Sequence, residues 1–140
     1  MTLVVDASVI VKWLLRDPAR ESDTARATEL MQAVATGQVA VLQPVHWLVE
    51  LGAVLARLSP STTEDDIEML AALELPSTNE PDVLRLGCRL AADLGQHMFD
   101  TLYHAVALGS PHGVLVTADA AYLRSAARLG HIVALRAWQR

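Results

Sequence analysis

The chain has 140 residues, of which 52% are hydrophobic and 19% charged, and its formal net charge is −5 at pH 7. This composition predicts one globular domain spanning residues 1–140 and excludes an intrinsically disordered chain. The negative charge is atypical of proteins that coat nucleic acids, because those are usually basic.

Three further features bear on the cellular compartment of the protein. No segment approaches the roughly 20 uninterrupted apolar residues that span a bilayer, so we expect no membrane association. The apolar start of the chain has no preceding basic stretch and is interrupted by Asp6, which argues against a signal peptide. The single cysteine, Cys88, permits no internal disulfide, which is typical of a cytoplasmic protein. We expect Cys88 to pack in the core as a small apolar residue.

The first half of the chain alternates short β-branched runs with segments of helical spacing. In chain order we expect a strand at 3–5, helices over 7–15 and 22–35, a strand at 39–42 and a helix over 45–58. Proline and glycine separate these segments, since neither residue continues a helix well.

The second half continues the same alternation. We expect helices over 61–73, 81–94 and 100–108, a strand at 113–116, a helix over 120–129 and a last strand at 132–135. Ser61 with Glu64 resembles a capping box at the start of its helix. Because strands alternate with helices, the sequence predicts an α/β fold with a central, mainly parallel sheet flanked by helices.

Four acidic residues stand at the ends of these elements or inside apolar stretches. Asp6 ends the first strand, and Asp119 lies just past the strand at 113–116. Glu50 interrupts an apolar helix, and Asp100 opens another. Each has an ordinary explanation when taken singly, such as helix capping by Asp100. Together they predict a carboxylate cluster, because ligands of open α/β sheets bind at the carboxyl ends of the strands.

Carboxylate oxygens are hard ligands that select Mg²⁺ or Mn²⁺ over softer metals. Such an ion lowers the pKa of a water that can then attack a phosphodiester, and a second ion can stabilise the leaving oxygen. A bound cation also reverses the local sign of charge, so an acidic pocket can still bind an anionic chain.

The motifs around these acids resemble those of the PIN-domain nucleases. The matching segments are Val4-Val5-Asp6-Ala7-Ser8, Glu50 on a mid-chain helix, Phe99-Asp100-Thr101-Leu102-Tyr103, and Thr117-Ala118-Asp119. The small size and the order of elements are similar to the VapC toxins of type II toxin–antitoxin systems. Each motif is short, but the ordered set spans nearly the whole chain. Phe99 departs from the family, which often has tyrosine there.

The resemblance implies a PIN fold and endonucleolytic cleavage of RNA. It implies that Asp6, Glu50, Asp100 and Asp119 form the metal site. Ser8 and Thr117 would support that site by hydrogen bonding. A homodimer and inhibition by a cognate antitoxin protein are implied as well.

Histidines beside two of the acids leave a different metal chemistry open. His46 and Glu50 are four residues apart on one helix, as are Asp100 and His104, so each pair shares a helix face. This spacing permits a mixed zinc or manganese site. The alternative is that His104 packs in the core or flanks the pocket and that His46 is exposed.

Basic residues near the acids are candidates for RNA contact. Lys12 and Arg16 follow Asp6 on the first helix, and Arg124 follows Asp119. Cations of this kind can meet phosphate, and the nearby Trp13 could stack on a base. The alternative is that Trp13 packs in the core and the cations are solvated.

A run of apolar positions exceeds the obvious need of one small core, and core packing or a partner groove could explain it. The positions are Leu48, Leu51, Val54, Leu55, Ile67, Leu70 and Leu73.

Three other functions stay open at this point. One is a PIN-type nuclease that processes RNA without being a toxin. The second is a catalytically inactive PIN-like module that binds other proteins. The third is a phosphatase with an aspartate nucleophile, although that chemistry favours a second aspartate where Ser8 stands.

Overall fold

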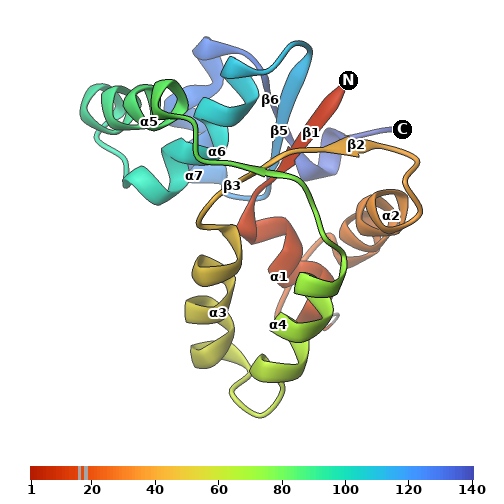
Figure 1. Ribbon diagram of the computed structural model, residues 1–140. Coiled ribbons are helices and arrows are strands. Elements are labelled where there is room, and N and C mark those ends of the chain that lie inside the picture. The colour runs from red at the N-terminus through yellow and green to blue at the C-terminus, as the bar shows by residue number, and fades with distance from the viewer. Residues whose placement is uncertain (16, 18) are drawn as a thin grey trace.

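A four-stranded parallel sheet forms the centre of the molecule, in the order β2-β1-β5-β6. The computed structural model describes residues 1–15, 17 and 19–140 (Figure 1). The four strands are β1 (Thr2–Val5), β2 (Ala40–Val41), β5 (Gly113–Thr117) and β6 (Ile132–Ala134). The predicted α/β fold with a mainly parallel sheet flanked by helices is confirmed.

Helices connect the strands and surround the sheet. They are α1 (Ala7–Leu15), α2 (Thr24–Ala35), α3 (Trp47–Leu58), α4 (Thr63–Ala72), α5 (Pro81–Leu94), α6 (Met98–Gly109) and α7 (Ala120–Ala126), with short 3₁₀ turns at Ala127–Leu129 and Leu135–Ala137. In Figure 1, α5, α6 and α7 gather on one side of the sheet and α2 lies on the other, while α3 and α4 extend beyond it as a pair.

The two central strands owe their apolar runs to burial on both faces. Leu3, Val4, Leu115 and Val116 are fully buried. Successive side chains of a strand point to opposite faces, so the burial of consecutive residues means that both faces are covered. Helix α6 contacts both strands. Their sequences are therefore continuous hydrophobic runs that do not alternate with polar residues.

The segment after β2 differs from the prediction. Instead of one strand over 39–42, the chain forms β2 and then β3 (Gln43–Pro44), which pairs in parallel with β4 (Ser77–Thr78) in a separate two-stranded sheet. The two-residue length of β4 is too short to produce a pattern in the sequence, which is why it was not predicted.

Gln43 explains how β1 stays paired where β2 leaves it. Its side chain is fully buried, Oε1 accepts from Val5 N at 2.8 Å, and Nε2 donates to Val5 O at 2.9 Å. The amide group thus takes the place of a strand neighbour at the last residue before Asp6. Both backbone groups of Val5 are satisfied away from water, which fixes the position of Asp6.

Three local predictions are wrong. The helix at Thr63 has Thr62 as its N-cap with no side-chain hydrogen bond, so Ser61 and Glu64 form no capping box there. Cys88 is exposed on α5 and does not pack in the core. Helix α6 begins at Met98 with His97 as its cap, so Asp100 lies in its first turn and does not cap it.

The surplus apolar positions of α3 and α4 are largely explained by packing between these helices and the core. Leu51, Leu55 and Leu70 are fully buried, and the other four positions pack against the core. No helix among the described residues is long and apolar enough to cross a membrane.

The amide of Gln43 gives a prediction about stability. We expect Gln43→Leu to lower the free energy of unfolding by about 2–4 kcal/mol, because it leaves the N–H and C=O of Val5 buried without partners. Urea denaturation measures this value. Gln32→Leu, an exposed position on α2, is the matched control and should change stability by less than about 0.5 kcal/mol. Equal stabilities for the two variants would contradict the role assigned to the amide.

Candidate functional site

The candidate site lies between β1 and β5, where the order in which the chain adds strands to the sheet reverses. From β1 the chain crosses to β2 on one side, and the later strands β5 and β6 add on the other side. Ligands of open α/β sheets bind at the carboxyl ends of the strands at such a point. Val5 pairs with Val116, so Asp6 and Thr117 emerge next to each other there.

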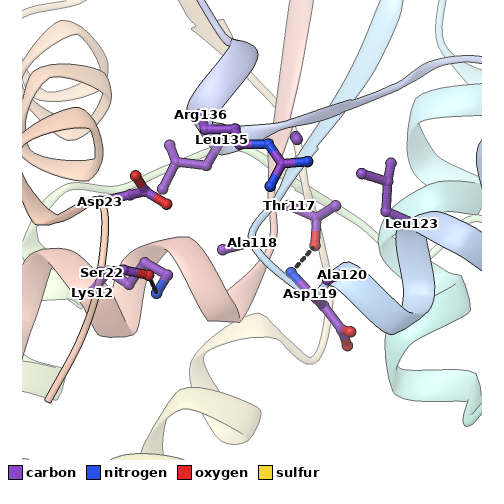
Figure 2. Close-up of a pocket in the computed structure, with 11 residues that line it drawn as sticks. Lys12, Ser22, Asp23, Thr117, Ala118, Asp119, Ala120, Leu123, Leu135 and Arg136 are labelled. Carbon is purple, nitrogen blue, oxygen red and sulfur yellow. Dashed lines mark hydrogen bonds between the residues drawn. The ribbon is translucent and has the colours of Figure 1, made fainter.

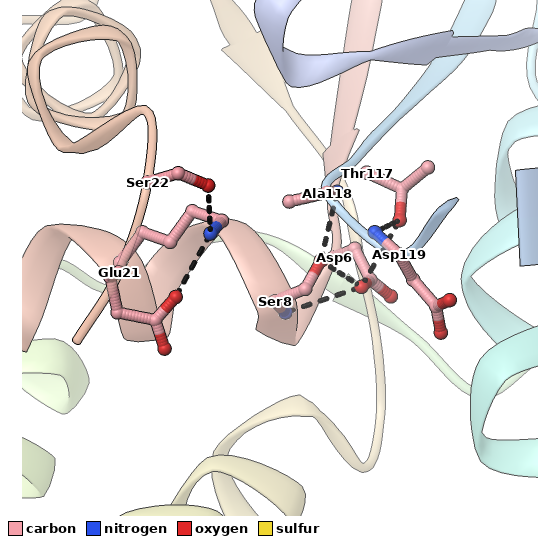
Figure 3. Close-up of polar contacts among 8 residues, drawn as sticks. Asp6, Ser8, Glu21, Ser22, Thr117, Ala118 and Asp119 are labelled. Atoms are coloured by element: carbon pink, nitrogen blue, oxygen red, sulfur yellow. Dashed lines mark hydrogen bonds and ion pairs between the residues drawn. The ribbon is translucent and has the colours of Figure 1, made fainter. Parts of the chain in front are cut away.

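Asp6 is held at this point by two hydroxyl groups. Its Oδ2 accepts hydrogen bonds from Ser8 Oγ at 2.5 Å, from Ser8 N at 3.2 Å and from Thr117 Oγ1 at 3.3 Å (Figure 3). The same hydroxyls accept from the next turn, Ser8 Oγ from Ala118 N and Thr117 Oγ1 from Asp119 N, both at 3.0 Å. The ends of β1 and β5 are therefore joined through Asp6, and the hydrogen bonding expected of Ser8 and Thr117 is present.

All four predicted carboxylates line one cleft of about 360 Å³. Asp6 comes from the end of β1, Glu50 from the first turn of α3, Asp100 from the first turn of α6, and Asp119 from the N-cap of α7. Asp119 also caps α7, since its Oδ1 accepts from Tyr122 N at 3.0 Å. Tertiary structure thus brings together acids separated by more than a hundred residues of sequence.

Burial and mutual repulsion raise the pKa values of two of these acids. Asp6 is only 8% exposed, and burial raises its pKa from 3.8 to about 7, with the charges of Glu50 and Asp100 adding to the shift and the Ser8 hydroxyl opposing it. The pKa of Asp100 is raised first by burial and then by Glu50 and Asp119. Perturbed carboxylates that converge in a cleft are typical of functional sites.

Glu50 lies against an aromatic wall, formed by His46, Phe99 and Tyr103, that connects α3 to α6. His46 Nε2 lies 3.3 Å from Glu50 Oε2 and donates to the carbonyl oxygen of Phe99 at 3.0 Å. The carbonyl can only accept, so Nε2 carries the proton. The His46 ring also packs edge-on against Tyr103, with ring centroids 5.1 Å apart. His46 therefore ties the helix of Glu50 to the first turn of α6, where Asp100 lies.

Three buried polar atoms in this wall have no hydrogen bond within the described part of the chain: His46 Nδ1, Glu50 Oε2 and Tyr103 Oη. The His46 side chain is only 12% exposed, so its expected exposure is wrong. Burial raises the pKa of Tyr103 well above its usual value, and the nearby Glu50 carboxylate adds to the shift. The buried oxygen of Glu50 therefore lies against the His46 and Tyr103 side chains, 3.3 Å from His46 Nε2.

His104 is a core residue. Its Nδ1 pairs with Tyr122 Oη at 3.0 Å and its Nε2 with the carbonyl oxygen of Gly130 at 2.8 Å. Burial lowers the pKa of the imidazole, which favours the neutral form. Because both ring nitrogens are occupied, His104 has no nitrogen to offer to a metal beside Asp100.

The predicted basic residues differ in their exposure, in their ion pairing and in whether they line the cleft. Lys12 is 9% exposed, lines the cleft, and forms an ion pair with Glu21 at 2.9 Å, so its charge is already compensated. Arg124 is exposed on α7 and does not line the carboxylate cleft. Arg16 lies outside the described residues. Trp13 packs against the core, as the structural alternative predicted.

The donors in the cleft suit a hard divalent cation. All four candidates offer carboxylate oxygens, which are the ligands that such a cation prefers. No three His, Cys, Asp or Glu side chains in the described ranges are grouped closely enough to hold a metal ion as they stand. Mg²⁺ usually takes one or two protein carboxylates and keeps several waters, so its binding does not require such a group. The residues present therefore fit Mg²⁺ or Mn²⁺.

Comparison with known proteins leaves the family open. No protein-family model matches the chain, and no curated protein matches its sequence. The resemblance to PIN-domain nucleases therefore depends on the short motifs and on their order along the chain.

The raised pKa of Asp6 predicts how stability depends on pH without metal. The folded pKa of about 7 exceeds the ordinary aspartate value of 3.8, so the native state binds the extra proton between these values. Stability therefore falls as pH rises through this window and stays low above it. Asp6→Asn removes the buried charge, so we expect it to be more stable than the wild type at pH 8 by about 1–3 kcal/mol.

Urea unfolding in chelator at pH 5 and pH 8 measures this difference. Asp93→Asn, an exposed position on α5, is the control and should leave the pH dependence unchanged. A less stable Asp6→Asn protein at pH 8 would show that the hydrogen bonds of the carboxylate outweigh its burial.

Proposed function

We propose that the protein is a metal-dependent endoribonuclease of PIN type that hydrolyses RNA phosphodiesters. The observation that carries this proposal is the convergence of Asp6, Glu50, Asp100 and Asp119 on one cleft at the carboxyl ends of β1 and β5. Carboxylates in this arrangement suit a hard cation, and phosphodiester hydrolysis is a reaction that such cations promote.

Asp6 and the other three carboxylates differ in the part that each would take in this proposal. A bound Mg²⁺ would lower the pKa of the attacking water and stabilise charge on the leaving oxygen. Asp6 is held rigidly by Ser8 and Thr117 and would serve as the fixed ligand. Glu50, Asp100 and Asp119 are the candidates for a second protein ligand, and waters would supply the remaining positions. Mn²⁺ has the same preference for oxygen and would substitute.

The cleft also accounts for how an acidic protein would bind RNA. Its carboxylates repel phosphate, whereas the bound cation reverses the local charge. RNA binding at the cleft should therefore depend on the metal, which distinguishes this protein from basic RNA-coating proteins.

The biological setting belongs to the same proposal. The resemblance to VapC toxins favours a toxin that forms a homodimer and is inhibited by a cognate antitoxin protein. A nuclease that processes RNA without toxicity would use the same cleft. The two differ in whether expression of the protein alone stops growth and whether a neighbouring gene restores it.

Cleavage of RNA tests the proposed activity directly. The purified protein is incubated with a panel of labelled structured RNAs in Mg²⁺, in Mn²⁺ and in chelator. We expect cleavage only with metal, and a loss of at least about 100-fold in the Asp100→Asn protein, because that variant removes a carboxylate from the cleft. Arg85→Ala, an exposed α5 variant, should cleave normally. Cleavage that persists in chelator, or that Asp100→Asn leaves intact, would contradict the proposal.

The contact between His46 and Glu50 predicts an effect on metal affinity itself. We expect His46→Ala to weaken Mn²⁺ binding about tenfold, since residues that orient metal ligands usually contribute on this scale. Isothermal titration calorimetry measures the affinity without relying on activity. His46→Gln should recover part of it, because an amide N–H can donate to the carbonyl of Phe99.

His112→Ala is the control for the loss of one histidine. His112 is exposed just before β5 and does not line the carboxylate cleft. We expect its Mn²⁺ affinity to stay within about twofold of the wild type. Equal weakening by both variants would contradict the role assigned to His46.

A further inference from the structure

A second pocket adjoins the carboxylate cleft on the far side of the turn after β5. It shares Lys12, Ala118 and Asp119 with the cleft, so the two hollows lie next to each other (Figure 2). Apolar side chains of Leu123 and Leu135 form part of its wall. A chain of phosphates that crosses the cleft at Asp119 would enter this pocket next.

Arg136 brings a positive charge to this pocket. It lies in the 3₁₀ turn after β6, where the buried neighbours Leu135 and Trp138 anchor the backbone. Figure 2 shows its guanidinium extending toward the side of the pocket where Thr117 lies. Among the described residues, no carboxylate lies within 4.0 Å of it, so its charge is not compensated by an ion pair.

The other charged groups of the pocket are already engaged or are anionic. Lys12 forms an ion pair with Glu21 and lies 3.5 Å from Ser22 Oγ. Asp23 and Asp119 also line the pocket, and Asp119 caps α7. Arg136 is therefore the group in this pocket best placed to attract an anion, and its planar fork suits two phosphate oxygens.

We infer that this pocket binds a backbone phosphate of the RNA strand next to the bond that is cleaved, with Arg136 as the contacting residue. The inference rests on the proposed ribonuclease function, because that function places the RNA across the cleft. It gives the acidic protein a cationic contact next to the carboxylates, in the pocket that Asp119 also lines. Sequence reasoning missed Arg136, since it lies 17 residues beyond Asp119 in a segment without a motif.

The test measures RNA affinity apart from cleavage. The Asp100→Asn protein keeps Asp6, Glu50 and Asp119, which are enough for Mg²⁺ because this ion usually takes one or two protein carboxylates. In Mg²⁺ it is titrated with a labelled single-stranded RNA at several salt concentrations. Adding Arg136→Ala should weaken binding about tenfold and reduce the salt slope by about 0.7, the value expected for one lost phosphate contact. Arg136→Lys should keep the slope and lose part of the affinity, because it keeps the charge without the fork.

Arg89→Ala in the same Asp100→Asn background is the control for the loss of one positive charge. Arg89 is exposed on α5 and lines neither the cleft nor this pocket, so its replacement should leave the affinity within about twofold and the slope unchanged. Thermal unfolding of each variant establishes that the proteins are folded.

The outcomes separate this inference from the proposed function. If the parent protein binds RNA and Arg136→Ala changes neither affinity nor slope, the inference is overturned and the nuclease proposal stands. If the wild type cleaves no RNA and the parent binds none, both are overturned. Inorganic phosphate serves as a competing probe: if its binding depends on Arg136 while RNA affinity does not, the pocket binds a free anion and the inference fails.

Discussion

The parallel pairing of β1 with β5 is the constraint on which the candidate site depends. Its register places Val5 opposite Val116, so the next residues, Asp6 and Thr117, emerge side by side at the carboxyl ends of their strands. The hydroxyls of Ser8 and Thr117 then join both strand ends to one oxygen of Asp6. A shift of one residue in this register would place Asp6 and Thr117 on opposite faces of the sheet, so they could no longer form the site together.

The site combines rigidity with electrostatic strain. Four acids share one cleft, and burial raises the pKa of Asp6 to about 7. Such an arrangement opposes the stability of the folded chain, because buried like charges repel one another and lose their hydration. The surrounding core and the buried amide of Gln43 offset that cost, whereas a cation in the cleft would remove it.

Charges around the cleft are arranged asymmetrically. The aromatic wall of His46 and Tyr103 holds α3 against α6 and leaves Glu50 Oε2 without a hydrogen bond. Lys12, which also lines the cleft, is paired with Glu21, while the guanidinium of Arg136 in the neighbouring pocket has no ion-pair partner among the described residues. An anionic ligand would be attracted to such a site by a few basic side chains near it, because the net charge of −5 repels anions.

The sequence by itself determined the α/β class, most of the element boundaries and the four candidate acids. These follow from local signals: buried strands read as apolar runs, helices repeat every 3.6 residues, and acids at the ends of apolar segments stand out. Only the tertiary structure decided what depends on contacts between distant segments. In the sequence, Gln43 is an ordinary polar residue, and only the structure shows that it bonds to Val5. His104 is a possible metal ligand in the sequence, whereas in the structure Tyr122 and Gly130 occupy its two nitrogens. Hydrogen-bond partners far apart in the chain leave no periodic pattern in the sequence, so folding alone reveals which polar residues are satisfied and which remain free to bind.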